Sequence, residues 1–166
     1  MTAIPFDVND GELRSSFFAH RVLDAFDGLT EQTPALWGKM TAQHMVEHLI
    51  WSFRYSTGGL DVPCRTPEKL LERAKRFLHD SRQMPQLFKN PLLGEEPPPL
   101  ELACLADAKA ALRREIDLFQ QHFQEEPDAL HVHPVFGPLN AEEWQRSHFK
   151  HCYHHLLQFG LINGVC

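Results

Sequence analysis

The sequence predicts an all-α protein, a four-helix bundle with one extra short helix and long connections. Apolar residues recur at spacings of three and four along most of the chain, as they do on the buried face of an amphipathic helix. Residues that cap helices stand at the starts of these segments. We find no convincing alternation of apolar and polar residues of the kind that marks a half-buried strand. The 166 residues fit one domain, which we expect to span 1–166.

The first two predicted helices each begin at a capping signal. Asn9 and Glu12 form a capping box, and the helix that follows is expected to end near Gly28. Thr41 can cap the second helix, which is expected to end at Gly58 and the glycine after it. Both helices carry apolar residues on one face, so both are expected to pack against the core.

The middle of the chain predicts the extra short helix, a long loop and a long amphipathic helix. Thr66 can cap the short helix, with Pro67 at its first position. Residues 81–99 contain five prolines and no sustained period, so they read as a loop. A loop of this length in a compact domain is usually functional or disordered. From Leu105 to Phe123, apolar residues then recur at helical spacing.

The last predicted helix follows a second loop, residues 127–139, which is marked by proline and glycine. Asn140 and Glu143 form a capping box at its start, and Gly160 is placed to end it after Phe159. The capping signals at both ends define which residues share a face of this helix.

Charge and hydropathy disfavour two classes of partner. The chain has 16 basic and 22 acidic residues, a formal net charge of −6. We therefore expect neither a nucleic-acid partner nor a polybasic membrane surface. No apolar run approaches the roughly 18 residues of a membrane span. Residues 1–10 lack a basic region followed by an apolar core, so no secretory signal is expected.

The four cysteines predict a reducing compartment. Cys64, Cys104, Cys152 and Cys166 are widely spaced and form no CxxC pair. This pattern indicates reduced thiols in a cytoplasmic protein rather than a disulfide framework or a zinc ribbon. Cys152 lies among several histidines, where a structural role is favoured over that of a nucleophile or soft ligand.

Eleven histidines are the unusual feature of the composition, and four of them fall within eight residues of the last helix. His151 and His155 are four residues apart, the spacing that lets two imidazoles on one helix bind one metal ion. Zinc, nickel, copper and iron all accept imidazole, so the spacing does not specify the metal. The alternative is that these histidines are core residues with hydrogen-bonded nitrogens. Histidines expected at the surface are His20, His79, His122 and His131.

The second helix offers a third ligand. His48 lies on its apolar face, so packing this helix against the last one would bring His48, His151 and His155 into a facial set of three. His44, one turn earlier, could reach the mouth of the bundle. Partners expected to orient such ligands, or to act as a fourth ligand, are His44, Glu47, His133, His154 and Gln158.

Two regions resemble the DinB-like superfamily. Residues 37–43, leading to Glu47-His48-Leu49, are similar to the entry into the second helix of DinB-like proteins. Residues 151–155 match the HxxHH motif of the last helix, and the segments HPVFGPL and HHLLQFG are closest to one branch of the superfamily. The resemblance implies an antiparallel four-helix bundle and a divalent metal, commonly nickel or zinc, bound by His48, His151 and His155. His44 departs from the pattern, which leaves a fourth ligand or a ligand swap open.

We therefore expect a metal-dependent enzyme that acts on a small molecule by hydrolysis or by thiol transfer. The resemblance implies a low-molecular-weight thiol as a candidate cosubstrate, since characterised DinB-like proteins include thiol-dependent S-transferases and a mycothiol-dependent isomerase. The alternative is a non-catalytic metal-binding or stress-related protein. A di-metal oxidase is less favoured, because that chemistry uses Glu-x-x-His pairs. A homodimer formed through an exposed helix face stays open.

Overall fold

A computed structural model of the chain describes residues 2–88 and 90–164. Its helical segments, in chain order, are α1 (Gly11–Ser16), the π-helical turn η1 (Phe17–Arg21), α2 (Val22–Asp27), α3 (Ala42–Ser56), α4 (Glu68–Lys75), the 3₁₀ turn η2 (Arg76–Leu78), α5 (Leu105–Glu125) and α6 (Ala141–Gln158). Its strands are β1 (Thr2–Ile4), β2 (His131–His133), β3 (Gly137–Leu139) and β4 (Ile162–Gly164).

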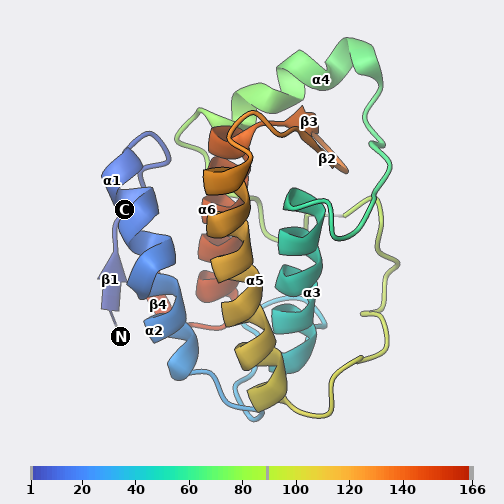
Figure 1. The fold of residues 1–166 in the computed structure, drawn as a ribbon. Coiled ribbons are helices and arrows are strands. Elements are labelled where there is room, and N and C mark those ends of the chain that lie inside the picture. Colours follow the sequence, from blue (N-terminus) through green and yellow to red (C-terminus); the bar gives the residue numbers. More distant parts are fainter. Residues whose placement is uncertain (1, 89, 165–166) are drawn as a thin grey trace.

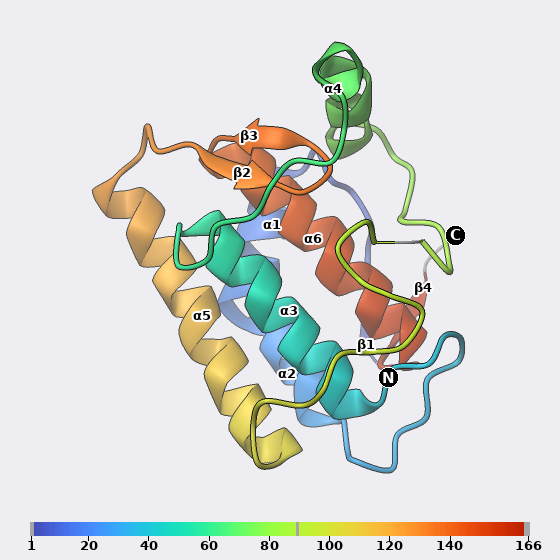
Figure 2. The same ribbon diagram turned by 90° about the vertical axis from the view of Figure 1, so that its right-hand side faces the viewer.

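The two helices that carry the predicted ligands, α3 and α6, lie next to each other. α1, η1 and α2 form one continuous column beside α6, and α3 packs against both α5 and α6 (Figure 1). α4 lies apart from these helices, at the end of the molecule where the β2–β3 hairpin lies. The connection from α4 to α5 then passes over α3 and α6 (Figure 2).

The prediction of an all-α four-helix bundle is wrong, because the described residues also form two small sheets. β1 pairs with β4 in parallel, and β2 pairs with β3 in an antiparallel hairpin. Each strand is only three residues long, too short to show the alternation that identifies a strand in a sequence. The β1–β4 pair also joins segments from opposite ends of the chain. The fold is therefore mixed α and β.

The β2–β3 hairpin forms within residues 127–139, where the sequence predicts only a loop. Gly137 has a φ of +70°, a conformation that residues with a side chain rarely adopt. The indole N–H of Trp144 donates to the carbonyl of His131 at 3.1 Å, which ties β2 to the first turns of α6. The hairpin therefore holds His133 over α6.

The predicted helix starts are confirmed in two cases and wrong in two. Thr41 caps α3 and Asn140 caps α6, each through its side chain. α1 is capped by Asp10 instead of Asn9, because the Asn9 side chain is used in long-range bonds. α4 begins at Glu68 with Pro67 at the capping position and no side-chain cap, one residue later than predicted from Thr66.

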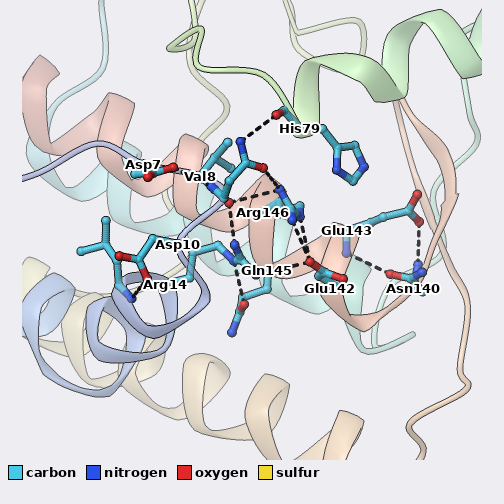
Figure 3. Close-up of polar contacts among 12 residues, drawn as sticks. Asp7, Val8, Asp10, Arg14, His79, Asn140, Glu142, Glu143, Gln145 and Arg146 are labelled. Atoms are coloured by element: carbon cyan, nitrogen blue, oxygen red, sulfur yellow. Dashed lines mark hydrogen bonds and ion pairs between the residues drawn. The ribbon is translucent and has the colours of Figure 1, made fainter.

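A polar network joins the N-terminal segment to α6 (Figure 3). The carbonyl of Val8 accepts hydrogen bonds from Arg14 at 2.5 Å and from Arg146 at 3.2 Å. Glu142 accepts from Arg146 at 2.8 Å, and the amide oxygen of Asn9 accepts from Arg146 at 2.6 Å. Both arginines are buried, so satisfying their donors is a condition for folding this region.

The core lies between the helices and is rich in aromatic rings. Buried phenylalanines from α3, α5, α6 and η1 make edge-to-face contacts, and Phe53 stacks on the imidazole of His148 with 3.9 Å between ring centroids. The core therefore continues into the histidine stripe of α6. Within residues 2–88 and 90–164, no helix is both long and apolar enough to cross a membrane.

A buried lysine holds the start of the long α4–α5 connection. The ammonium group of Lys150, on α6, donates to the carbonyls of Phe77, Asp80 and Arg82 and lies 3.9 Å from the centroid of the Phe77 ring. These bonds fix residues 77–82 against α6. The segment after them runs past the histidines, so the lysine helps to position one wall of the site.

Candidate metal centre

His48 of α3 and His151 and His155 of α6 form a compact group that could hold a metal ion. The Nε2 atom of His151 lies 2.8 Å from Nε2 of His48 and 3.1 Å from Nε2 of His155. Candidate ligand atoms of the three residues lie within 4.8 Å of one another. Three imidazole nitrogens that converge from two helices are the donor set of many zinc sites.

The surroundings keep these imidazoles neutral. Burial lowers the pKa of His48 to about 4, with His154 adding a smaller effect. Burial, followed by the neighbouring histidines, also lowers the pKa of His151 and of His155 well below the ordinary value. A neutral imidazole has one nitrogen with a free lone pair, which is the form that binds a metal.

Gln158 decides which nitrogen of His155 carries the proton. Its amide N–H donates to the carbonyl of Trp37 at 2.9 Å, so its oxygen faces His155 and accepts from Nδ1 at 2.7 Å. Nδ1 of His155 is therefore the donor, and Nε2 keeps its lone pair for the centre of the group. Gly38, with a φ of +82°, leaves room for this contact, because a Cβ there would lie 3.1 Å from Nε2 of Gln158.

The three histidines lie on the wall of a large cavity of about 1630 Å³. The other walls come from α4, the loop between β2 and β3, and the long α4–α5 connection. The lining is mainly apolar and includes Trp51, Tyr55, Leu70, Phe77, Met84 and Phe136. A molecule in this cavity can therefore reach the three imidazoles.

Two of the expected partners of the ligands lie elsewhere. His44 completes the cap of α3, where its Nδ1 lies 2.8 Å from Oγ1 of Thr41, and it does not line the cavity. Glu47 accepts hydrogen bonds from the backbone N–H groups of Glu101 and Leu102 at 2.8 and 3.1 Å. Its carboxylate therefore binds the segment that leads into α5, and its hydrogen-bond partners among the described residues do not include His48.

His133 and His154 both line the cavity without belonging to the group of three. Nδ1 of His133 accepts from the backbone N–H groups of Val135 and Phe136 at 3.0 and 3.2 Å, and burial lowers its pKa to about 3. Nδ1 of His154 lies 3.3 Å from the carbonyl of Met84 and so donates to it. His154 thereby connects α6 to the cavity wall.

Two other residues of the histidine cluster belong to the core. His148 lies fully buried between Phe53 and Trp144, and its Nε2 donates to Oγ of Ser56 at 2.9 Å. Burial raises the pKa of the Cys152 thiol, so this cysteine is a poor nucleophile. Cys64 and Cys104 are also free thiols. Cys166, which the sequence groups with them, lies outside the described residues.

Sequence reasoning missed several features of the region. His122 and His131, expected at the surface, are half-buried and face each other with 2.8 Å between their Nε2 atoms. The carbonyl of Trp37 accepts the bond that orients Gln158, a role that no feature of the sequence indicates. Nothing in the sequence around Lys150 indicates that it binds the carbonyls of Phe77, Asp80 and Arg82. Each contact joins residues distant in the chain or on separate elements, so no local pattern could have revealed it.

A family model described as "Protein of unknown function (DUF1569)" matches residues 21–160. No curated protein and no solved structure matches the chain. The matched range contains α3, α6 and all three histidines of the group. Because the match covers most of the length of the chain, the chain belongs to the DUF1569 family.

Proposed function

We propose that the protein is a metal-dependent enzyme that acts on a small molecule by hydrolysis or thiol transfer. One divalent ion, zinc or nickel, would be held by His48, His151 and His155. The observation that carries this proposal is the convergence of three imidazoles, that of His155 buried and those of His48 and His151 half-buried, on the wall of a cavity large enough for a substrate. A structural metal site would more often be closed by four protein ligands.

The residues present fit such an ion. Gln158 holds Nδ1 of His155 as a donor, which leaves Nε2 for the metal, and an outer hydrogen bond of this kind is typical of metal-binding histidines. The walls of the cavity beside the group are mainly apolar. A bound divalent ion supplies one kind of chemistry there: it lowers the pKa of a water molecule or of a thiol cosubstrate and so makes a nucleophile.

We also propose that this family is related to DinB-like proteins through its metal centre. One observation supports this relation: His48 of α3 lies next to His151 and His155 of the HxxHH motif in α6, as the resemblance implies. His44, the departure from the pattern, is engaged in capping α3. The proposed metal site therefore has three protein ligands and leaves a coordination position for water or substrate.

Metal content tests the site. Untagged protein is purified without chelator and its metal is measured by plasma mass spectrometry, with about one ion per chain expected. His151→Ala and His155→Ala should each lose the ion, whereas His20→Ala, on the exposed face of η1, should keep it. Full metal content in both α6 variants would overturn the assignment.

Turnover tests the enzyme. Metal-loaded protein is screened with ester, amide and lactone substrates, and with electrophiles together with low-molecular-weight thiols. The expected result is a metal-dependent rate that is lost in His151→Ala and retained in His20→Ala. A protein that binds the metal but turns over none of these compounds would contradict the catalytic part of the proposal and leave the metal site standing.

A further inference from the structure

The cavity beside the three histidines is cationic, although the protein as a whole has a net charge of −6. Among the described residues that line it, five are basic and two are acidic. They are Lys39, Arg73, Arg76, Arg82 and Lys150 against Glu95 and Glu96. A surface that concentrates positive charge on an acidic protein favours an anionic ligand.

Two of these cations are free to bind a ligand. Lys39 pairs with Glu96, whereas Arg82 and Lys150 both pair with Asp80. Arg73 and Arg76 make no side-chain hydrogen bond or ion pair with any residue in 2–88 and 90–164. A guanidinium presents several N–H donors in a plane that matches the two oxygens of a carboxylate.

The helix that carries Arg73 also presents apolar side chains to the cavity. Positions 70, 73, 74 and 77 share one face of α4 and η2 at spacings of three and four, and all four line the cavity. No residue of α4 is buried, and Leu70 is 42% exposed. Elsewhere on the cavity wall, Leu87 and Phe88 are 69% and 45% exposed. Leu70, Leu87 and Phe88 are therefore left uncovered by the described residues, whereas the ring of Phe77 is in contact with Lys150 and Phe136.

We infer that the cavity binds an extended apolar molecule that ends in a carboxylate. The carboxylate lies at Arg73 and Arg76, and the apolar body lies against Leu70, Phe77 and the other apolar walls. Covering exposed apolar side chains removes apolar area from water, which favours such a ligand. As the substrate class of the enzyme, this inference rests on the proposed function; as a binding site, it does not need the metal.

Binding of a fatty acid tests the inference directly. The probe is 11-(dansylamino)undecanoic acid, whose fluorescence rises in an apolar site, and it is displaced by dodecanoate or by dodecanol below their aggregation concentrations. Dodecanoate should displace the probe at least ten-fold more effectively than dodecanol. Equal displacement by acid and alcohol would overturn the role of the arginines, and displacement by inorganic phosphate alone would overturn the apolar ligand.

A pair of double variants locates the anionic end. Arg73→Gln with Arg76→Gln should weaken binding of the probe at least ten-fold. Arg113→Gln with Arg114→Gln, which removes two exposed arginines from α5, should leave it unchanged. Circular dichroism verifies that both proteins are folded. An equal effect of the two double variants would contradict the inference. The comparison of dodecanoate with dodecanol is independent of this test, because it is made on the unaltered protein.

A metal-ligand variant separates this inference from the proposed function. His151→Ala should lose the metal and still bind the probe with an affinity within about three-fold of the unaltered protein. If the unaltered protein and His151→Ala both bind the probe and neither contains metal, the proposed metal centre is wrong and the cavity is supported as a binding site. Failure of the probe to bind, with metal content intact, would overturn the inference alone.

Discussion

Gln158 illustrates how one side chain can set the chemistry of its neighbour. Its amide is orientated by the carbonyl of Trp37, and this orientation determines that His155 presents Nε2 to the group of three. An imidazole without that constraint would divide its population between two tautomers, of which only one has a free lone pair in place. The conformation of residues 36–38 therefore contributes to the metal affinity that we propose.

Removing this amide should weaken metal binding without abolishing the fold. Gln158→Leu keeps the side-chain volume but loses the acceptor, so we expect the metal affinity to fall about 10- to 100-fold. Gln158→Glu keeps an acceptor oxygen and should retain more of the affinity. Gln121→Leu, on the exposed face of α5, serves as control. The measurement is a competition titration against a chelator, and an unchanged affinity in Gln158→Leu would refute this role.

His133 should make the protein sensitive to acid. The unfolded chain takes up a proton at the ordinary pKa of 6.5, whereas burial lowers the pKa in the folded state to about 3. Acid therefore favours the unfolded state, and stability falls as the pH decreases from about 7 toward about 3. Between pH 7.5 and pH 5 this one residue accounts for a loss of about 2 kcal/mol.

Replacing His133 by asparagine should remove this part of the acid sensitivity. The amide oxygen of asparagine can accept the backbone N–H bonds of Val135 and Phe136, and it does not titrate. We expect the difference in unfolding free energy between pH 7.5 and pH 5 to shrink by about 2 kcal/mol. Urea denaturation at the two pH values measures it. His20→Asn, on the exposed face of η1, should leave the difference as it is.

At the scale of elements, Glu47 connects α3 to the segment that leads into α5. Burial raises the pKa of its carboxyl group, but hydrogen bonds from Glu101, Gln43 and Leu102 more than compensate and lower it overall. The carboxylate is thus charged and accepts from two backbone N–H groups and from the side-chain amide of Gln43. The structure gives it no contact with His48, whose position one residue later in sequence places it on another face of the helix.

Glu47→Leu should therefore destabilise the fold and spare the metal. Two backbone N–H groups would lose their acceptor, which costs about 1–3 kcal/mol for each group that stays buried. We expect the urea midpoint to fall and the affinity for zinc in the folded state to change less than three-fold. A loss of metal affinity comparable to that of Gln158→Leu would show that Glu47 orients a ligand after all.

At the scale of the whole molecule, metal binding and folding should be coupled, because the three ligands come from two helices far apart in the sequence. An ion that binds only the folded chain stabilises it by about 2.7 kcal/mol at a free concentration of 100 times Kd. Thermal unfolding with and without zinc measures this effect. The stabilisation should vanish in His151→Ala and persist in His20→Ala; an equal shift in both would indicate binding elsewhere.

The sequence predicts the helical parts of the fold well because their signals are local. The capping residues of α3 and α6 and the apolar period of α5 all lie within one element. The all-α class fails because each strand contributes only three residues, and a pair such as β1–β4 exists only once the two ends of the chain have been brought together. For the same reason the sequence misassigns the cap of α1: the distant Arg146 side chain binds Asn9, and Asp10 caps the helix instead.

The sequence by itself determined that His151 and His155 share a face, since four residues on a capped helix place two side chains one turn apart. Only the tertiary structure decided what stands opposite them. His48 joins the group because α3 packs beside α6, whereas His44 is bound to the cap of its own helix and Glu47 to the start of α5. The cavity, its unpaired arginines and the orientation of Gln158 depend on segments from α4, the hairpin and residues 36–38. Contacts of that kind are set by packing, which a single sequence does not display.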